Sequence, residues 1–488
     1  MAKRTAVIDI GSNSVRMVIY EKSSRFAFSL IHESRSRVRI SENSYQNGSM
    51  LQEIAMSRAD SALSEFVSIA SSYGVRKVLC VATSAVRDAS NANEFVSSIK
   101  KRLSLKIKVI DGEREAYLGA IAAANLLAPV DAMAIDLGGG SMEFAQIRDA
   151  LVDEHGSIDL GSVRIKELFL DRGDLSGARA FIEQKLAEIS HIESKTIVGI
   201  GGTFRSLAQI IQKNEKYPYK KLHGYRFSSQ LMLDLIDKIL CSSSTKELKD
   251  LGIKSERLDI IKSGAVILEA LLRKSACKEL ICSGVGVREG VYLADLLRHS
   301  RDRFPHNFNP SLKYLLDRHV LEPKFSSMLS SVTAKLFDLL YKKLSLSLEY
   351  REILLAASKL TTVGVPINFY SYHKRSHYLI LNALSYGYTH EQIITIATLV
   401  RSHKHKKVSK TALSRHKNLL PSKDVLSGLN MILSLADALL AHRPKSLDLK
   451  FSIDHKERLC VESKSPLYLA KEQIASLRID TELDIVYK

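Results

Sequence analysis

The sequence predicts an α/β protein, with two related α/β domains in tandem followed by a mainly helical domain and a small α+β cap. Strand-like and helix-like segments alternate up to about residue 300, and one strand–turn–strand pattern occurs twice. Beyond residue 310 helical spacing dominates. The 488 residues, 45% of them apolar, suffice for several cores. We therefore expect domains at 1–125, 126–300, 301–445 and 446–488.

The first expected domain opens with two short apolar strands around a tight turn, TAVIDIG and SVRMVIYEK, within residues 5–22. Helical spacing follows over 49–72. The remaining segments are a buried strand, KVLCVATS, a helix near 91–103, the strand KIKVID at 106–111 and a helix from Gly112 to about Leu127.

The second expected domain repeats the opening pattern of the first. AMAIDLGGGSMEFAQIRD at 132–149 matches AVIDIGSNSVRMVIYEK at 6–22, and Asp136 matches Asp9 at an offset of 127. Two such domains are expected to enclose a ligand cleft. The domain continues with a helix near 178–189, the strand KTIVGIGG at 195–202, a helix from Thr203, the strand KELICSGVG at 278–286 and a helix from Val287.

The polar stretch RHSRDRFPHNFNP, with two prolines, predicts a domain boundary at 300–310. Helical spacing then extends to about 442, and short alternating segments follow from 446. No apolar run is long enough for a membrane helix, and the N-terminus has no apolar signal-peptide core. The five cysteines show no CxxC pair, which is typical of reduced thiols. We expect a cytoplasmic protein without a membrane partner.

The net charge of +18 is concentrated toward the C-terminus. From Arg301 onward there are 29 Lys+Arg against 17 Asp+Glu, an excess of 12. Such a field attracts polyanions, although a solvated lysine-rich surface explains most individual charges equally well. The densest patch is Arg401-Ser402-His403-Lys404-His405-Lys406-Lys407.

Four glycine-rich turns are candidate phosphate sites, because glycine lets a ligand approach backbone N–H groups closely. The third turn also opens a helix, whose dipole favours an anion. A single turn of this kind is more often only structural, but four in a tandem α/β frame favour phosphate binding. They are Gly11-Ser12-Asn13-Ser14, Gly138-Gly139-Gly140-Ser141, Gly201-Gly202-Thr203 and Ser283-Gly284-Val285-Gly286.

Three carboxylates at these turns, Asp9, Asp136 and Glu143, are candidate magnesium ligands. The alternative is that the two aspartates only cap their turns. Arg87 has the planar fork that suits phosphate oxygens, or it forms a surface ion pair with Asp88.

Glu113 and Glu115 begin the helix that connects the two domains. Each could simply complement the helix dipole, or one could accept a proton from an attacking water.

Together these motifs resemble the Ppx/GppA phosphatase family, within the actin-like sugar kinase/Hsp70 superfamily. The matching stretches follow one another in order over about 1–300: DIGSNSVRMVIY, ATSAVRDASN, DGEREA, DLGGGSMEF, GIGGTFRSLA, LHGY and SGVGVREGV. The resemblance implies two actin-like (ribonuclease H-like) α/β domains.

The resemblance also implies roles for individual residues. Glu115 aligns with the family's general base, although the sequence Glu113-Arg114-Glu115 departs from the usual paired acids and leaves Glu113 as an alternative. Asp136 and Glu143 align with metal- and phosphate-site carboxylates, and Arg87 with the phosphate-binding arginine. The glycines of 138–140 and 201–202 align with the family's phosphate loops, and Ser12, Asn13, Ser141 and Thr203 of the glycine turns complete the candidate phosphate site.

The stretch HKRSHYLI at 373–380 resembles part of the HD-like helical domain of longer members. The adjacent His-Asp of that domain is replaced by Thr361-Thr362, which argues against a second metal-dependent active site. Histidines on a basic helical surface are usually only solvated. Our interpretation is that this domain forms a dimer interface or a polyanion track that contains His373, His377, Arg401, Lys404, Lys406 and Lys407.

The resemblance implies hydrolysis of terminal phosphoanhydride bonds in inorganic polyphosphate, in guanosine pentaphosphate (pppGpp), or in both. Magnesium is the expected cofactor, with a monovalent cation as a further candidate, and a homodimer without specific nucleic-acid binding is expected. The alternatives are an actin-like ATPase or small-molecule kinase, and a non-enzymatic regulator that binds alarmones or other polyanions.

Overall fold

The computed structural model describes residues 3–44, 48–404, 414, 416–477 and 483–487. Internal contacts divide the chain into two compact units, Met1–Phe308 (unit 1) and Asn309–Lys488 (unit 2). The division lies within the polar, proline-containing stretch that the sequence marks as a boundary. The fold is the predicted one of mixed α/β sheets followed by a helical region.

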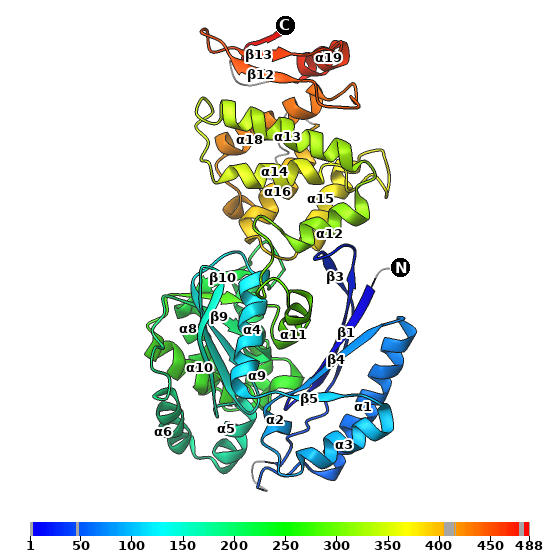
Figure 1. Cartoon of the computed structure of the whole chain (residues 1–488). Helices are drawn as coiled ribbons and strands as arrows, with labels where there is room; N and C mark the ends of the chain where they lie inside the picture. The colour runs from blue at the N-terminus through cyan, green and yellow to red at the C-terminus, as the bar shows by residue number, and fades with distance from the viewer. Residues whose placement is uncertain (1–2, 45–47, 405–413, 415, 478–482, 488) are drawn as a thin grey trace. The chain divides into compact units, whose positions relative to one another are not determined.

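The N-terminal half of unit 1 is a five-stranded sheet in the order β3-β2-β1-β4-β5 (Figure 1). Its strands are β1 (Lys3–Ile10), β2 (Val15–Lys22), β3 (Phe28–Ser36), β4 (Lys77–Ala82) and β5 (Ile107–Val109). Helices α1 (Glu53–Ser72) and α3 (Ala92–Leu103) bury a shared apolar core with this sheet, and the short α2 (Ser84–Arg87) follows β4. The edge strand β3 was not predicted, because it is polar and only partly buried.

The C-terminal half of unit 1 contains a six-stranded sheet in the order β10-β11-β9-β6-β7-β8. Its strands are β6 (Ala132–Leu137), β7 (Met142–Arg148), β8 (Leu151–Ile158), β9 (Thr196–Ile200), β10 (Tyr225–Ser228) and β11 (Glu279–Cys282). The helices of this half are α5 (Ser162–Leu168), α6 (Leu175–Leu186), α7 (Gly202–Asn214), α8 (Ser229–Cys241), α9 (Thr245–Asp250) and α10 (Ile261–Ser275). The sequence pattern missed β8 and β10, because β8 is mostly exposed and β10 has only four residues.

The repeat seen in the sequence is a repeat of strand pairing. The antiparallel pair β1–β2 places Asp9 opposite Arg16, and the pair β6–β7 places Asp136 opposite Glu143. Asp136 follows Asp9 by 127 residues, and Glu143 follows Arg16 by the same 127 residues. Arg16 and Glu143 therefore occupy equivalent positions in the two copies.

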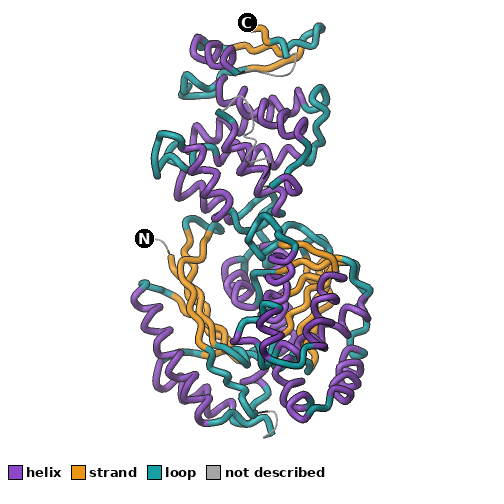
Figure 2. The backbone as a smooth tube through the Cα atoms, turned by 180° about the vertical axis from the view of Figure 1, so that it is seen from behind, coloured by secondary structure: helices purple, strands orange, loops and turns teal. Residues whose placement is uncertain are grey.

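Two helices lie between the sheets of unit 1 (Figures 1 and 2). Helix α4 (Gly112–Leu126) packs on β7 and β8, α11 (Val287–Leu296) packs on β1, and the two helices pack on each other. Their backbones approach at Gly290, where an added Cβ would overlap the carbonyl oxygen of Leu118. This close crossing joins the two halves into one unit.

Unit 2 is a helical body with a small terminal sheet. Its helices are α12 (Pro310–His319), α13 (Pro323–Leu340), α14 (Tyr350–Leu360), α15 (Tyr372–Ala383), α16 (His390–Ser402) and α18 (Lys423–Leu439). Strands β12 (Lys450–Ile453), β13 (Leu459–Glu462) and β14 (Ile485–Tyr487) accompany α19 (Tyr468–Ser476), as the alternating segments predict. Within the described part of the chain, no helix has both the length and the apolar character to cross a membrane.

We expect Gly290→Ala to destabilise unit 1 by about 1–3 kcal/mol, because backbone atoms of α4 cannot rotate away from the added methyl group. The matched control is Gly119→Ala on α4, whose added Cβ would lie 3.8 Å from its nearest neighbour, Ile200 Cδ1. Urea unfolding of the full chain measures both. Equal midpoints for the two variants would show that the helix crossing tolerates the methyl group.

Candidate active site

A cavity of ≈150 Å³ lies between the two halves of unit 1. It is lined by the ends of both sheets and by the helix starts that follow them. Its wall includes Asp9, Ser12, Asn13, Arg16, Glu115, Asp136, Gly138, Gly139, Ser141, Gly201, Gly202, Thr203, Arg205, Arg257 and Arg288. Of the predicted site residues in unit 1, Arg87, Gly140 and Glu143 lie outside this wall.

The two repeated turns form opposite walls of the cavity. Each is closed by one backbone hydrogen bond, from Gly11 N to Ser14 O (3.3 Å) and from Gly138 N to Ser141 O (3.0 Å). A Cβ on Gly139 would lie only 2.7 Å from Cβ of Ser12, so the turns face each other at a distance that requires glycine.

The third turn approaches Asp136 through Gly201, which has φ +95° in the left-handed region. A Cβ there would lie 2.8 Å from Asp136 Oδ1 and 2.7 Å from Leu137 O. Gly202 then begins α7 and directs backbone N–H groups of its first turn toward the cavity wall. In the fourth turn Gly286 lines the cavity, whereas Gly284 N donates to Nδ1 of His223 (3.1 Å).

Helix α4 separates the two candidate bases. Successive residues of an α-helix are rotated by about 100°, so positions two apart point to nearly opposite sides. Glu115 is 8% exposed and lines the cavity, whereas Glu113 is exposed. Arg87 donates from Nη1 to Glu115 Oε2 (2.9 Å) and to Ile110 O (3.3 Å). The predicted phosphate-binding arginine therefore contacts the candidate base itself.

A chain of polar contacts connects this pair to the second turn. Arg87 Nε lies 3.4 Å from Oδ1 of Asp88, whose Oδ2 accepts from Nη2 of Arg164 (2.8 Å). Arg164 Nε donates to the carbonyl oxygen of Gly140 (2.7 Å). Gly140 thus takes part through its carbonyl group, behind the wall formed by its neighbours.

Glu143 lies behind Ser141. Its Oε1 accepts hydrogen bonds from Ser141 Oγ (2.5 Å) and Ser157 Oγ (2.8 Å). Burial raises the pKa of Glu143 to about 7, with the charge of Asp136 adding to the effect. Burial also raises the pKa of Asp136 to about 6, and it raises the pKa values of Asp9 and Glu115. Crowded, poorly hydrated carboxylates of this kind gain from a nearby cation.

Four arginines that the sequence analysis did not select also line the cavity: Arg16, Arg205, Arg257 and Arg288. Burial, reinforced by Arg288 and Arg205, lowers the pKa of Arg16 to about 9, and burial lowers the pKa of Arg257 to about 10. Guanidinium groups gathered in a partly desolvated cavity are suited to an oxyanion with several charges.

A sequence signal existed for some of these arginines. Arg16 is the repeat equivalent of Glu143, and Arg205 and Arg288 closely follow the third and fourth glycine turns. Arg257 had no signal, because it lies far from every motif in the sequence. The fold brings it against Gly202, where any Cβ would overlap its guanidinium group.

The donor set fits a magnesium ion only together with a ligand. Among the residues that the structure describes, no group of three His, Cys, Asp or Glu side chains is arranged to hold a metal by itself. Magnesium is usually held by one or two carboxylates, with water and phosphate oxygens completing its shell. Asp9 and Asp136 on the cavity wall meet that requirement.

The residues of the predicted polyanion track do not share one solvent-exposed surface. His373 is buried (7% exposed), and Nδ1 of the half-buried His377 lies 3.0 Å from Ala397 O. His373 therefore does not present its ring to a polyanion in solvent. Arg401 is half-buried in α16, and Lys404 Nζ lies 4.7 Å from the ring centroid of Tyr372. Lys406 and Lys407 lie outside the described residues.

Thr361, which stands where the HD domain has its His-Asp pair, is held by hydrogen bonds to neighbouring residues. Ser376 Oγ donates to the carbonyl oxygen of Thr361 (2.8 Å) and accepts from Gly364 N (2.9 Å). Thr361 is 1% exposed and donates from Oγ1 to Ser358 O (3.1 Å). These contacts tie the start of α15 to the segment that follows α14.

We expect metal-free protein to lose stability between pH 5 and pH 7.5 through Glu143. Its folded-state pKa of about 7 exceeds its ordinary value of 4.5, so its protonated form favours folding and that stability is lost as the pH rises through 7. Glu143→Gln should reduce this loss of unfolding free energy with rising pH by on the order of 1–3 kcal/mol. Thermal unfolding in EDTA measures it. Parallel curves for the two proteins would contradict the assignment.

Comparisons with known proteins identify the family. The model of the Ppx/GppA phosphatase family matches residues 18–299, and that of Ppx/GppA phosphatase domain III matches residues 291–482. A crystal structure of an Aquifex aeolicus member of the family is 29% identical, with a TM-score of 0.53, over 62% of this chain and 99% of that chain. An exopolyphosphatase from Cytophaga hutchinsonii is 25% identical, with a TM-score of 0.55, over 60% of this chain and 98% of that chain.

A curated relative shows the same likeness within a longer protein. The bifunctional 3-dehydroquinate synthase/phosphatase of Fusobacterium nucleatum is 28% identical over 286 residues, which cover 55% of this chain and 43% of that protein. The match thus spans less than half of the relative. The family models together cover nearly the whole length, and the first of them includes the second glycine turn, the buried Glu115 and the cavity arginines Arg205, Arg257 and Arg288. This chain belongs to the Ppx/GppA phosphatase family.

Proposed function

We propose that this protein hydrolyses terminal phosphoanhydride bonds and releases orthophosphate from inorganic polyphosphate, pppGpp or both. One observation carries the proposal: a buried carboxylate with a raised pKa, Glu115, lies in the same cavity as residues of all four glycine turns and four arginines. Family membership supports the same chemistry.

The cavity supplies what phosphoryl transfer to water requires. The terminal phosphate is held by N–H groups of the turns at Gly11, Gly138 and Gly202 and by the arginine side chains. Glu115 accepts a proton from a water molecule whose oxygen bonds to phosphorus as the anhydride P–O bond breaks. The leaving phosphate oxygen takes up the negative charge, which the guanidinium groups stabilise.

The raised pKa of Glu115 suits this role, because a general base works best when its pKa lies near the working pH. The charge of Arg87 and its hydrogen bond to Glu115 oppose the effect of burial on the pKa of Glu115. Arg87 also fixes Oε2 of the Glu115 carboxylate. The position of helix α4 then sets the direction of the other oxygen, Oε1.

Magnesium is the proposed cofactor. Asp136 and Asp9 would hold it, with Glu143 adjacent behind Ser141. When bound, the ion supplies charge neutralisation at the phosphate oxygens.

We expect Glu115→Gln to lower the rate of phosphate release by about 10²–10⁴-fold, because glutamine keeps the size of the side chain but cannot accept a proton. The matched control is Glu113→Gln, which changes the exposed carboxylate two residues earlier and should retain the wild-type rate. Phosphate release is measured with long-chain polyphosphate, pppGpp and ATP in parallel, in magnesium.

The outcomes separate the candidate functions. Release from polyphosphate or pppGpp that depends on Glu115 supports the proposal and identifies the preferred substrate. Release from ATP alone would indicate an actin-like ATPase or kinase, and tight binding without release from any substrate would indicate a non-enzymatic regulator.

A further inference from the structure

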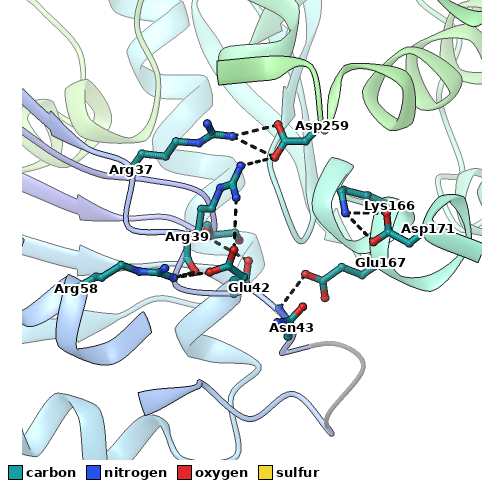
Figure 3. A network of polar contacts seen from close by, with 11 residues as sticks. Arg37, Arg39, Glu42, Asn43, Arg58, Lys166, Glu167, Asp171 and Asp259 are labelled. Carbon is teal, nitrogen blue, oxygen red and sulfur yellow. Dashed lines mark hydrogen bonds and ion pairs between the residues drawn. The ribbon is translucent and has the colours of Figure 1, made fainter. Parts of the chain in front are cut away.

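Three arginines at every second position, Arg35, Arg37 and Arg39, extend from the N-terminal half of unit 1 toward the C-terminal half. Arg37 Nη2 donates to both carboxylate oxygens of Asp259 at 3.1 Å, and Arg39 Nη2 donates to Asp259 Oδ2 at 2.6 Å (Figure 3). Arg35 Nη1 donates to Glu256 Oε1 at 3.2 Å. These four hydrogen bonds connect the two sides of the cleft.

The acceptors of these bonds flank a cavity residue. Glu256 and Asp259 lie one residue before and two residues after Arg257, on a tight turn that is closed by hydrogen bonds from Arg257 N to Lys254 O (2.8 Å) and from Ile260 N to Arg257 O (3.1 Å). Arg257 is 8% exposed and lines the cavity, whereas Asp259 is about one-third exposed. The turn therefore presents its acids to the arginines of the other half and Arg257 to the cavity.

The segment that carries these arginines is anchored on the first glycine turn, Gly11-Ser12-Asn13-Ser14. Arg39 N donates to Asn13 O (3.1 Å), and Ser41 donates to Ser12 O from both its N–H group (3.3 Å) and its hydroxyl group (3.2 Å). Glu42 accepts from Arg39 (3.4 Å) and holds that side chain in place (Figure 3). A continuous set of contacts thus leads from the first glycine turn to the turn that carries Arg257.

A further contact crosses the cleft beside the arginines. Asn43 N donates to Oε1 of Glu167, on α5 of the C-terminal half (3.1 Å; Figure 3). Glu167 is buried (5% exposed), so this contact is shielded from water. The segment 35–43 therefore meets the opposite half at two places.

We propose that Glu256 and Asp259 are positioning residues: their ion pairs with the arginine triplet hold the cleft closed and place Arg257 against the bound phosphate. This inference rests on the proposed use of the cavity as a phosphate site. A single half-exposed ion pair contributes little. Here Asp259 accepts from two arginines, and the pairs act on one short turn, so their loss displaces a cavity residue rather than a surface side chain.

Salt distinguishes this arrangement from a buried contact. Ion pairs between charges that remain about one-third exposed weaken as salt is added, most clearly toward about 1 M, where the Debye length of about 3 Å approaches the length of the pairs. Closure, and with it the affinity for phosphate, is therefore sensitive to salt through Asp259. Removing Asp259 removes that part of the salt dependence.

The test replaces Asp259 by Asn in the full chain and uses inorganic tripolyphosphate as the probe. The dissociation constant is measured by calorimetry in a Glu115→Gln background, so that it does not depend on turnover, and kcat and KM are measured with Glu115 intact. We expect the dissociation constant to rise about tenfold, which corresponds to about 1.4 kcal/mol of binding free energy. KM should rise by the same factor, with kcat nearly unchanged. A general folding defect would instead lower kcat.

Matched variants complete the design. Glu279→Gln removes a comparable half-exposed pair with Arg226 (2.8 Å) that lies away from the cavity, and it should leave the dissociation constant unchanged. Arg37→Gln together with Arg39→Gln removes both donors to Asp259 from the opposite side and should reproduce the effect even if Asp259→Asn folds poorly. In an Arg257→Ala background, Asp259→Asn should have little further effect, because both act through the same guanidinium group.

Wild-type affinity in Asp259→Asn and in the double variant of Arg37 and Arg39, or full additivity with Arg257→Ala, would overturn the positioning role. If the wild type binds tripolyphosphate but releases no phosphate, the proposed hydrolysis fails, while the binding measurements still decide the role of Asp259. If the wild type does not bind tripolyphosphate, both proposals fail.

Discussion

The site depends on one repeated constraint, which is the turn that joins two antiparallel strands at the end of each sheet. In each copy one hydrogen bond closes the turn, and an aspartate lies at the end of the preceding strand. Gly139 permits the two turns to approach until Ser12 lies against it. Because each turn is rigid and the turns face each other, backbone donors converge on one small volume without any side chain that has to be ordered on binding.

Charge in this volume is balanced across the repeat. Equivalent strand positions carry Arg16 in one half and Glu143 in the other, so the repeat places opposite charges at these two positions. Burial raises the pKa values of the carboxylates and lowers that of Arg16, which means that each set alone is poorly solvated. A phosphate bound together with a cation supplies a counter-charge to the arginines and to the carboxylates at the same time. The ligand therefore completes the electrostatics of the cavity, and the interdomain contacts of the arginine triplet add a structural route to the same end.

Unit 2 has a different relation to function. The segment equivalent to the HD pair is tied down by Ser376, and His373 is a buried side chain rather than a surface donor. We place the proposed reaction in unit 1, because the cavity that contains Glu115 and the four arginines lies there. The basic residues of unit 2 contribute charge to the chain; of the two described basic residues in the patch from Arg401, Arg401 is half-buried and Lys404 lies over the ring of Tyr372.

The sequence by itself determined the α/β class, the repeat at an offset of 127 residues, the glycine turns and the carboxylates at their edges, because these depend on local periodicity and on residues within a few positions of a turn. The motif favoured Glu115 over Glu113 only by resemblance, and the rotation of α4 against the sheet is what places Glu115 in the cavity and Glu113 in solvent. Only the tertiary structure brought in Arg257 and paired Asp259 with Arg37 and Arg39, since contacts between residues more than two hundred positions apart arise from packing and leave no local pattern.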